Sequence, residues 1–277
     1  MAEKLPEEVG SRRLDKTGKT VFDGIYDAPD PRSYYAVMQA LDYRIPMQAL
    51  PFFTRLFTNY RHANSQQEVL NVLDLGSSYG VNAALLKWHL TLQDLYAHYA
   101  GNIEVDFATL LSHDREYFAS CGKQAGLAIT GFDVSENALQ YATQAGLLDQ
   151  AVCLNLEENE ADARQGEIIS SSDCVISSGC IGYITETSLE KILELCSPRR
   201  PWMAHCILRM VSTEPFEALL RERGYRVWQE STLLPQRRFA SEEEQVQMLG
   251  RLREQGIDPQ GYEAEGWLYA RVLMAVP

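Results

Sequence analysis

The sequence predicts an α/β fold: a doubly wound, mainly parallel seven-stranded sheet with an antiparallel last strand. From about residue 68 onward, short apolar and β-branched runs alternate with segments of helical periodicity, as in parallel sheets covered by helices on both faces. A helical segment rather than a simple crossover separates the last two strands, which indicates a closing antiparallel pair. A glycine-rich turn follows the first strand, at the sheet edge where such folds hold ligands.

The elements follow from these runs in order. Ser135 is expected to cap the second helix of the alternating region, and Ser241 with Glu244 to form a capping box on the last helix. The predicted strands are QQEVLNVLDLG, LAITGFD, AVCLNL, DCVISSG, WMAHCILRM, YRVWQESTLL and WLYARVLMAV. The predicted helices are VNAALLKWHL, SENALQYATQAGL, TSLEKILELC, EPFEALLRERG and SEEEQVQMLGRLREQG.

The chain is expected to form one domain, residues 21–277, after a flexible charged tail, residues 1–20. The aromatic segment that prolines interrupt, residues 21–65, predicts a helical N-terminal cap. Residues 91–122 are expected to be a helical insertion, and residues 236–262 an insertion before the last strand. QRRF, residues 236–239, is expected in a loop, where its arginines contact either an anion or solvent.

Composition narrows the class of protein. The 277 residues are 45% hydrophobic and 23% charged, as in soluble globular proteins. The net charge of −13 and the lack of a basic run argue against a nucleic-acid partner. No apolar run is long enough for a signal peptide or a membrane span, so a cytoplasmic monomer or homodimer is expected. Neither the six cysteines nor the five histidines have metal-ligand spacing, so no metal site is expected.

The glycine turn reads D-L-G-S-S-Y-G. It is neither a P-loop nor a G-x-G-x-x-G dinucleotide turn. Asp74 ends a strand before bare backbone at Gly76 and Gly80, which suits a cationic, nucleoside-like ligand better than a pyrophosphate. Asp133 ends the next strand and can accept hydrogen bonds from both ribose hydroxyls; for this residue alone, an acid that interacts with the dipole at a helix N-terminus is the alternative.

Together these motifs resemble the class I S-adenosylmethionine-dependent methyltransferases, whose fold is Rossmann-like. The resemblance covers about residue 68 to the C-terminus and implies S-adenosylmethionine as the cofactor. It places the first motif under the amino-acid part of the cofactor, Asp133 and Val134 at the ribose, the next segment at adenine, and the end of the fourth strand beside the methyl group. The residues so placed are Asp74, Gly76, Ser77, Ser78, Tyr79, Gly80, Asp133, Val134, Asn155, Leu156, Glu157, Ser178 and Gly179.

The sequence departs from the family pattern in three places. Ser78 stands where the motif has its central glycine. The acid after the third strand is either replaced by Asn155 or displaced to Glu157. From Gly80 to Asp133 there are 53 residues instead of about 20, which requires the 91–122 insertion.

Three residues are candidates for catalysis. Tyr183 either faces the substrate or caps the following helix. Arg209 either binds a substrate carboxylate or forms a salt bridge to a helix. His113 either acts as a base with Asp114 or lies on an exposed helix face, whereas His205 is expected in the core.

The sequence therefore predicts methyl transfer to oxygen or nitrogen of a small-molecule metabolite, with a carboxylate-bearing substrate as one option. Two alternatives stay open: a different S-adenosylmethionine reaction, or a non-catalytic module that binds a partner protein. The cap tyrosines Tyr26, Tyr34, Tyr35 and Tyr43 are expected either to cover the ligand or to pack on the sheet.

Overall fold

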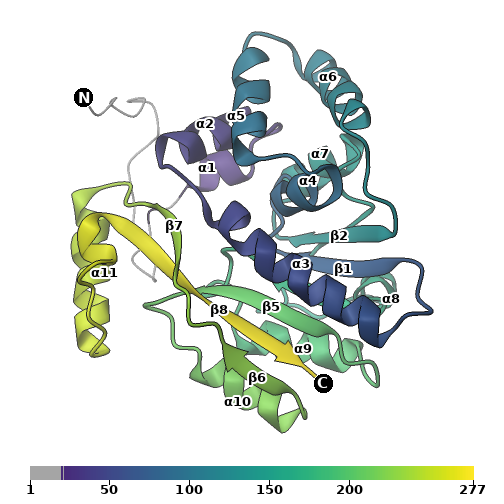
Figure 1. The fold of residues 1–277 in the computed structure, drawn as a ribbon. Helices are drawn as coiled ribbons and strands as arrows, with labels where there is room; N and C mark the ends of the chain where they lie inside the picture. Colours follow the sequence, from purple (N-terminus) through teal and green to yellow (C-terminus); the bar gives the residue numbers. More distant parts are fainter. Residues whose placement is uncertain (1–19, 21) are drawn as a thin grey trace.

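The computed structural model describes residues 20 and 22–277 and confirms the predicted doubly wound sheet (Figure 1). The strand order is β3-β2-β1-β4-β5-β8-β6, and β7 also pairs with β8. The first five strands pair in parallel, whereas β8 is antiparallel to β5, β6 and β7. The strands are β1 Leu70–Leu75, β2 Leu127–Asp133, β3 Gln150–Cys153, β4 Cys174–Ser177, β5 Trp202–Leu208, β6 Arg226–Gln229, β7 Leu234–Arg238 and β8 Trp267–Val276.

Helices cover both faces of the sheet, and the alternation of side chains along each strand explains why. In β1, Leu70 and Val72 belong to one buried cluster, while Leu73 and Leu75 belong to the other. The first cluster is shared with α3, α4 and α7, and the second with α8, α9 and α10. None of the helices in the described chain is long and apolar enough to cross a membrane. The helices on the faces are α3 Ile45–Ala63, α4 Val81–Trp88, α7 Glu136–Gln144, α8 Ala163–Ser170, α9 Glu186–Leu195 and α10 Glu214–Glu222.

The sheet has eight strands rather than the predicted seven. The segment YRVWQESTLL was expected to be one strand, but it contributes to two strands, β6 and β7, which pair with successive parts of the ten-residue β8. QRRF was expected in a loop, but Gln236, Arg237 and Arg238 belong to β7. The last helix, α11 (Glu242–Glu254), follows directly and lies between β7 and β8 in the chain.

Two further groups of helices lie beside the sheet. Helices α1 (Asp23–Tyr26) and α2 (Arg32–Ala40) fall in the predicted cap, and α5 (Leu92–Gly101) and α6 (Phe107–Ser120) in the predicted insertion. Helix α2 packs against α5 (Figure 1). The buried carboxylate of Asp114 on α6 accepts hydrogen bonds from His98 Nε2 at 2.7 Å, Tyr99 OH at 2.8 Å and Tyr141 OH at 2.7 Å. Asp114 therefore joins α5, α6 and α7.

The two capping predictions have different outcomes. Ser135 caps α7, since its hydroxyl accepts from the backbone N–H of Ala138. Ser241 likewise accepts from Glu244 N, but Glu244 does not complete the box. Its buried carboxylate instead accepts from Arg237 and from the backbone N–H of Thr20 and Ala240. Apart from Thr20, the predicted tail lies outside the described residues.

Candidate functional site

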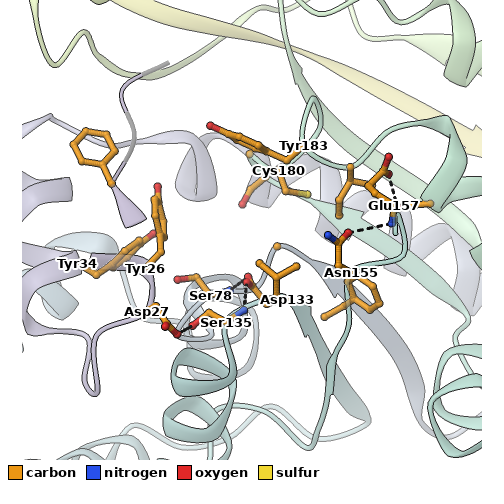
Figure 2. Close-up of a pocket in the computed structure, with 18 of the residues that line it drawn as sticks. Tyr26, Asp27, Tyr34, Ser78, Asp133, Ser135, Asn155, Glu157, Cys180 and Tyr183 are labelled. Carbon is orange, nitrogen blue, oxygen red and sulfur yellow. Dashed lines mark hydrogen bonds between the residues drawn. The ribbon is translucent and has the colours of Figure 1, made fainter. Parts of the chain in front are cut away.

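A cavity of about 870 Å³ lies at the carboxyl ends of β1, β2 and β4 and is covered by the cap (Figure 2). This size is within the range of small-molecule sites. The side chains that line it come from the cap, the glycine turn, the ends of β2, β3 and β4, and β7. They include Tyr26, Asp27, Tyr34, Tyr43, Gly76, Ser78, Asp133, Val134, Asn155, Leu156, Glu157, Ser178, Gly179, Cys180, Tyr183, Gln236 and Arg237.

The glycine turn contains left-handed backbone and a close contact with Cys180, which small residues permit. Gly76 has φ of +66°, and a Cβ built on it would lie 2.5 Å from Cys180 Cβ. The Gly76 N–H donates to Phe132 O at 2.8 Å, which holds the turn against β2. Ser78, at the position where the family has glycine, also has a positive φ of 47°. Gly80 begins α4 in the left-handed conformation. The turn thus presents main chain to the cavity at Gly76 and Ser78.

Three predicted residues of this motif, Asp74, Ser77 and Tyr79, are buried and, like Gly80, do not line the cavity. Asp74 Oδ1 accepts from Asn82 Nδ2 at 2.8 Å, while its Oδ2 has no hydrogen-bond partner within the described chain. Burial raises the pKa of Asp74 to about 7 against the effect of this hydrogen bond. Tyr79 points the other way, and its single hydroxyl hydrogen is shared between two carbonyls of the cap, Ile25 O at 3.0 Å and Ala28 O at 2.8 Å. Asn82 was not predicted, because it follows the motif inside the helix.

Asp133 lies where the predicted ribose acid should be. Its carboxylate accepts from the backbone N–H of Ser78 at 2.8 Å and of Ser135 at 3.1 Å, which fixes it at the cavity wall (Figure 2). Burial raises its pKa despite these hydrogen bonds. A carboxylate can accept about four hydrogen bonds, so Asp133 keeps acceptor capacity for a ligand. Val134 beside it is 66% exposed and forms an apolar edge of the same cavity.

After β3, Asn155 and Glu157 both line the cavity, but their side chains have different hydrogen-bond partners. The Glu157 carboxylate accepts from Thr185 N, Thr185 Oγ1 and Ser188 Oγ at the start of α9. These hydrogen bonds lower its pKa although burial opposes this. Glu157 is therefore a helix cap. Asn155 Oδ1 accepts from Glu157 N at 3.1 Å, which leaves the amide nitrogen of Asn155 toward the cavity (Figure 2). Leu156 is buried at the cavity wall.

The end of β4 supplies Ser178, Gly179, Cys180 and Tyr183, which all line the cavity. Cys180 Sγ donates to Leu75 O at 3.2 Å, and burial raises the pKa of its thiol well above the ordinary value. Cys180 is thus a neutral wall residue. Tyr183, 45% exposed, reaches across the cavity toward the cap (Figure 2).

The other two catalytic candidates lie outside this cavity. Arg209 is buried, with Nη1 2.6 Å from Glu263 Oε2 and Nη2 bonded to Asp258 O, so its charge is already neutralised. His113 Nδ1 bonds to Asn102 Oδ1 on the surface of the insertion. Arg209 thus forms a salt bridge, and His113 lies on an exposed helix face, which are the non-catalytic alternatives given for each. His205 is buried and bonded to Ser177, and burial lowers its pKa to about 4, as expected for a core histidine.

A buried ion pair at the cavity was not predicted from the sequence. Arg237 on β7 donates to Glu244 Oε2 at 2.9 Å and to Oε1 at 2.7 Å, and both side chains are almost fully buried. Burial opposes both charges, yet these hydrogen bonds raise the pKa of Arg237 and lower that of Glu244. Arg237 and Glu244 are seven residues apart, and two other acids directly precede Glu244, so nothing in the sequence singles out this pair.

Comparison with known proteins gives structural neighbours alone: no family model and no curated protein matches the sequence. Magnesium protoporphyrin IX methyltransferase from Synechocystis, solved with S-adenosylmethionine, is 14% identical, with a TM-score of 0.42 over 88% of this chain and 83% of that one. The plantazolicin methyltransferase BamL, solved with S-adenosylhomocysteine, is 11% identical, with a TM-score of 0.47 over 91% and 93%. A TehB-like methyltransferase from Corynebacterium glutamicum is 11% identical, with a TM-score of 0.37 over 82% and 96%.

Proposed function

We propose that the chain is an S-adenosylmethionine-dependent methyltransferase that acts on a small molecule. One observation carries this proposal. The cavity brings together a fixed carboxylate, Asp133, and the bare main chain of Gly76 and Ser78, at the carboxyl ends of neighbouring parallel strands. A carboxylate in this place suits a ribose diol, and the bare turn suits a chain that runs along the backbone.

The remaining parts of the cavity fit the rest of this ligand. The amide nitrogen of Asn155 can donate to a ring nitrogen of adenine, between the apolar side chains of Val134 and Leu156. Asp74 lies beneath the turn and does not line the cavity, so it supports the turn rather than contacts the ligand. These residues would hold adenosine at one end of the cavity, with the amino-acid end of the cofactor along Gly76 and Ser78.

When bound, S-adenosylmethionine supplies a methyl group that its positive sulfur already activates. The chain's own residues therefore align the acceptor and exclude water rather than form a covalent intermediate. Tyr26, Tyr34, Tyr183 and Gly179 line the part of the cavity in which the acceptor would lie. The un-ionised thiol of Cys180 does not compete as a nucleophile.

Calorimetric titration with S-adenosylhomocysteine tests the cofactor site. Asp133→Asn should weaken binding about 10- to 100-fold, because hydrogen bonds to a charged group contribute about 1.5–3 kcal/mol. The matched control is Glu167→Gln, which removes an exposed acid on α8 outside the cavity. Equal affinity of the wild-type protein and the Asp133→Asn variant would contradict the ribose site, and no binding to the wild-type protein would contradict the function.

A further inference from the structure

We propose that the methyl acceptor is an amine carried on an apolar or aromatic body, and that Gln236 positions its nitrogen. This inference rests on the proposed methyl transfer, since it names the substrate class of the same cavity. Three independent features of the cavity support it: the charge of its lining, an unpaired buried acceptor, and an aromatic wall.

The charged side chains along the cavity are almost all acidic. Arg237 is the only basic residue among the described lining residues, and the bidentate contact with Glu244 neutralises it. A carboxylate or phosphate that enters this space would lose its hydrating water and find no free cationic side chain to pair with, which is costly. An ammonium group enters a field of the favourable sign. The acids of the lining are Asp27, Asp133, Glu136, Glu157 and Glu158.

Gln236 supplies the second feature. Its side chain is 3% exposed, lines the cavity from β7, and has an Oε1 without a hydrogen-bond partner in the described chain. Its amide lies over Gly179, since Nε2 is 3.2 Å from the position that a Cβ on Gly179 would take. A buried acceptor without a donor is unfavourable, so a ligand N–H is expected there. A carboxylate acceptor has no hydrogen to donate.

Aromatic rings from the cap supply the third feature. Tyr26 and Tyr34 stand together on one side of the cavity, with ring centroids 5.7 Å apart, and Tyr183 lies opposite (Figure 2). Tyr43 lines the cavity on the Gly179 side. Faces of aromatic rings attract cations and pack against apolar or aromatic bodies. A carbon skeleton that ends in an amine therefore fits both the wall and Gln236.

The transfer step balances as follows. The ammonium first releases one proton to water. The lone pair of the resulting neutral amine then forms the new N–C bond while the methyl C–S bond breaks, and the electron pair of that bond stays on sulfur as neutral S-adenosylhomocysteine. The methylated nitrogen carries the positive charge. If the amine N–H donates to Gln236 Oε1, the nitrogen is held with its lone pair free for the methyl group.

The test uses three probes with one skeleton: 2-phenylethylamine, 2-phenylethanol and 3-phenylpropionate. Each is titrated calorimetrically into the wild-type protein saturated with S-adenosylhomocysteine. The amine should bind at least about 10-fold more tightly than the carboxylate, as expected for a charge difference in a partly desolvated site. Gln236→Leu should weaken amine binding about 10-fold without changing the affinity for S-adenosylhomocysteine.

Gln236→Glu is the second variant, because it keeps an acceptor of the same shape and adds a negative charge. It should bind the amine as tightly as the wild-type protein or more tightly. A carboxylate that binds as well as the amine, or an amine that does not bind, overturns the proposed substrate class. A tenfold loss with Gln236→Glu overturns the role of Gln236. A wild-type protein that fails to bind S-adenosylhomocysteine overturns the proposed function instead.

Discussion

Replacing Gly76 by alanine should lower the stability of the protein through two effects, backbone strain and a clash with Cys180, and a control variant separates them. Gly76 has φ of +66°, and the new Cβ would lie 2.5 Å from Cys180 Cβ and 3.1 Å from its Sγ. Gly146 is the matched control, because it has φ of +84° and nothing within 4 Å of its Cβ position. The left-handed backbone costs alanine about 1–2 kcal/mol at both positions. Overpacking adds about 1–3 kcal/mol at Gly76 alone.

Urea denaturation of the ligand-free protein measures this difference. Gly76→Ala should lower the free energy of unfolding by about 2–5 kcal/mol, and Gly146→Ala by about 1–2 kcal/mol. Cys180→Gly removes the clashing Cβ, so the double variant should be more stable than additivity predicts by about 1 kcal/mol or more. Equal losses at the two glycines, or strict additivity with Cys180→Gly, would refute the reasoning.

Three further variants test other contacts. Asp74→Asn should be more stable than the wild-type protein at pH 8, by up to on the order of 4 kcal/mol, and similar to it near pH 4, in thermal unfolding curves without ligand. The folded-state pKa of Asp74 is raised to about 7, so the folded protein favours the protonated carboxyl. The stability of the wild-type protein therefore falls as the pH rises from about 4 to 7. If the wild-type protein and the variant showed the same dependence of unfolding temperature on pH, this explanation would be wrong. Tyr79→Phe loses the hydroxyl hydrogen that is shared between two carbonyls of the cap, so limited proteolysis should cut residues 22–31 faster. An unchanged rate would show that this contact does not hold the cap. Glu244→Gln should lower the free energy of unfolding by about 3–5 kcal/mol, because Arg237 stays buried without its carboxylate, and a loss below 1 kcal/mol would contradict the importance of this pair.

Much of the fold could be predicted because its signals are local. The first strand, the glycine turn and the cap at Ser135 depend on neighbouring residues, and the structure contains all three. Strand β7 was missed because Pro235 and two arginines are atypical of strands. Pairing with β8, about 30 residues later in the chain, makes this segment a strand.

The site was harder to predict because long-range partners decide which side chains stay available. Arg209 was expected either to bind a substrate carboxylate or to form a salt bridge, and its partner in the salt bridge, Glu263, is 54 residues away. Glu157 was one of two options for the acid after the third strand; it lines the cavity, and its carboxylate also accepts a hydrogen bond from Thr185 at the start of α9. Tyr34 and Tyr35 are adjacent in the sequence, yet Tyr34 lines the cavity while Tyr35 stacks on Tyr99 in the core. Such choices depend on how helices rotate against the sheet, which local sequence does not specify.

A crystal structure of the protein with S-adenosylhomocysteine is the most direct test of the proposed cofactor site. We expect the ribose hydroxyls on the Asp133 carboxylate, adenine against Leu156 with a hydrogen bond from Asn155, and the amino-acid end along Gly76 and Ser78. Ligand density elsewhere, or in this cavity without a contact to Asp133, would contradict the proposed site.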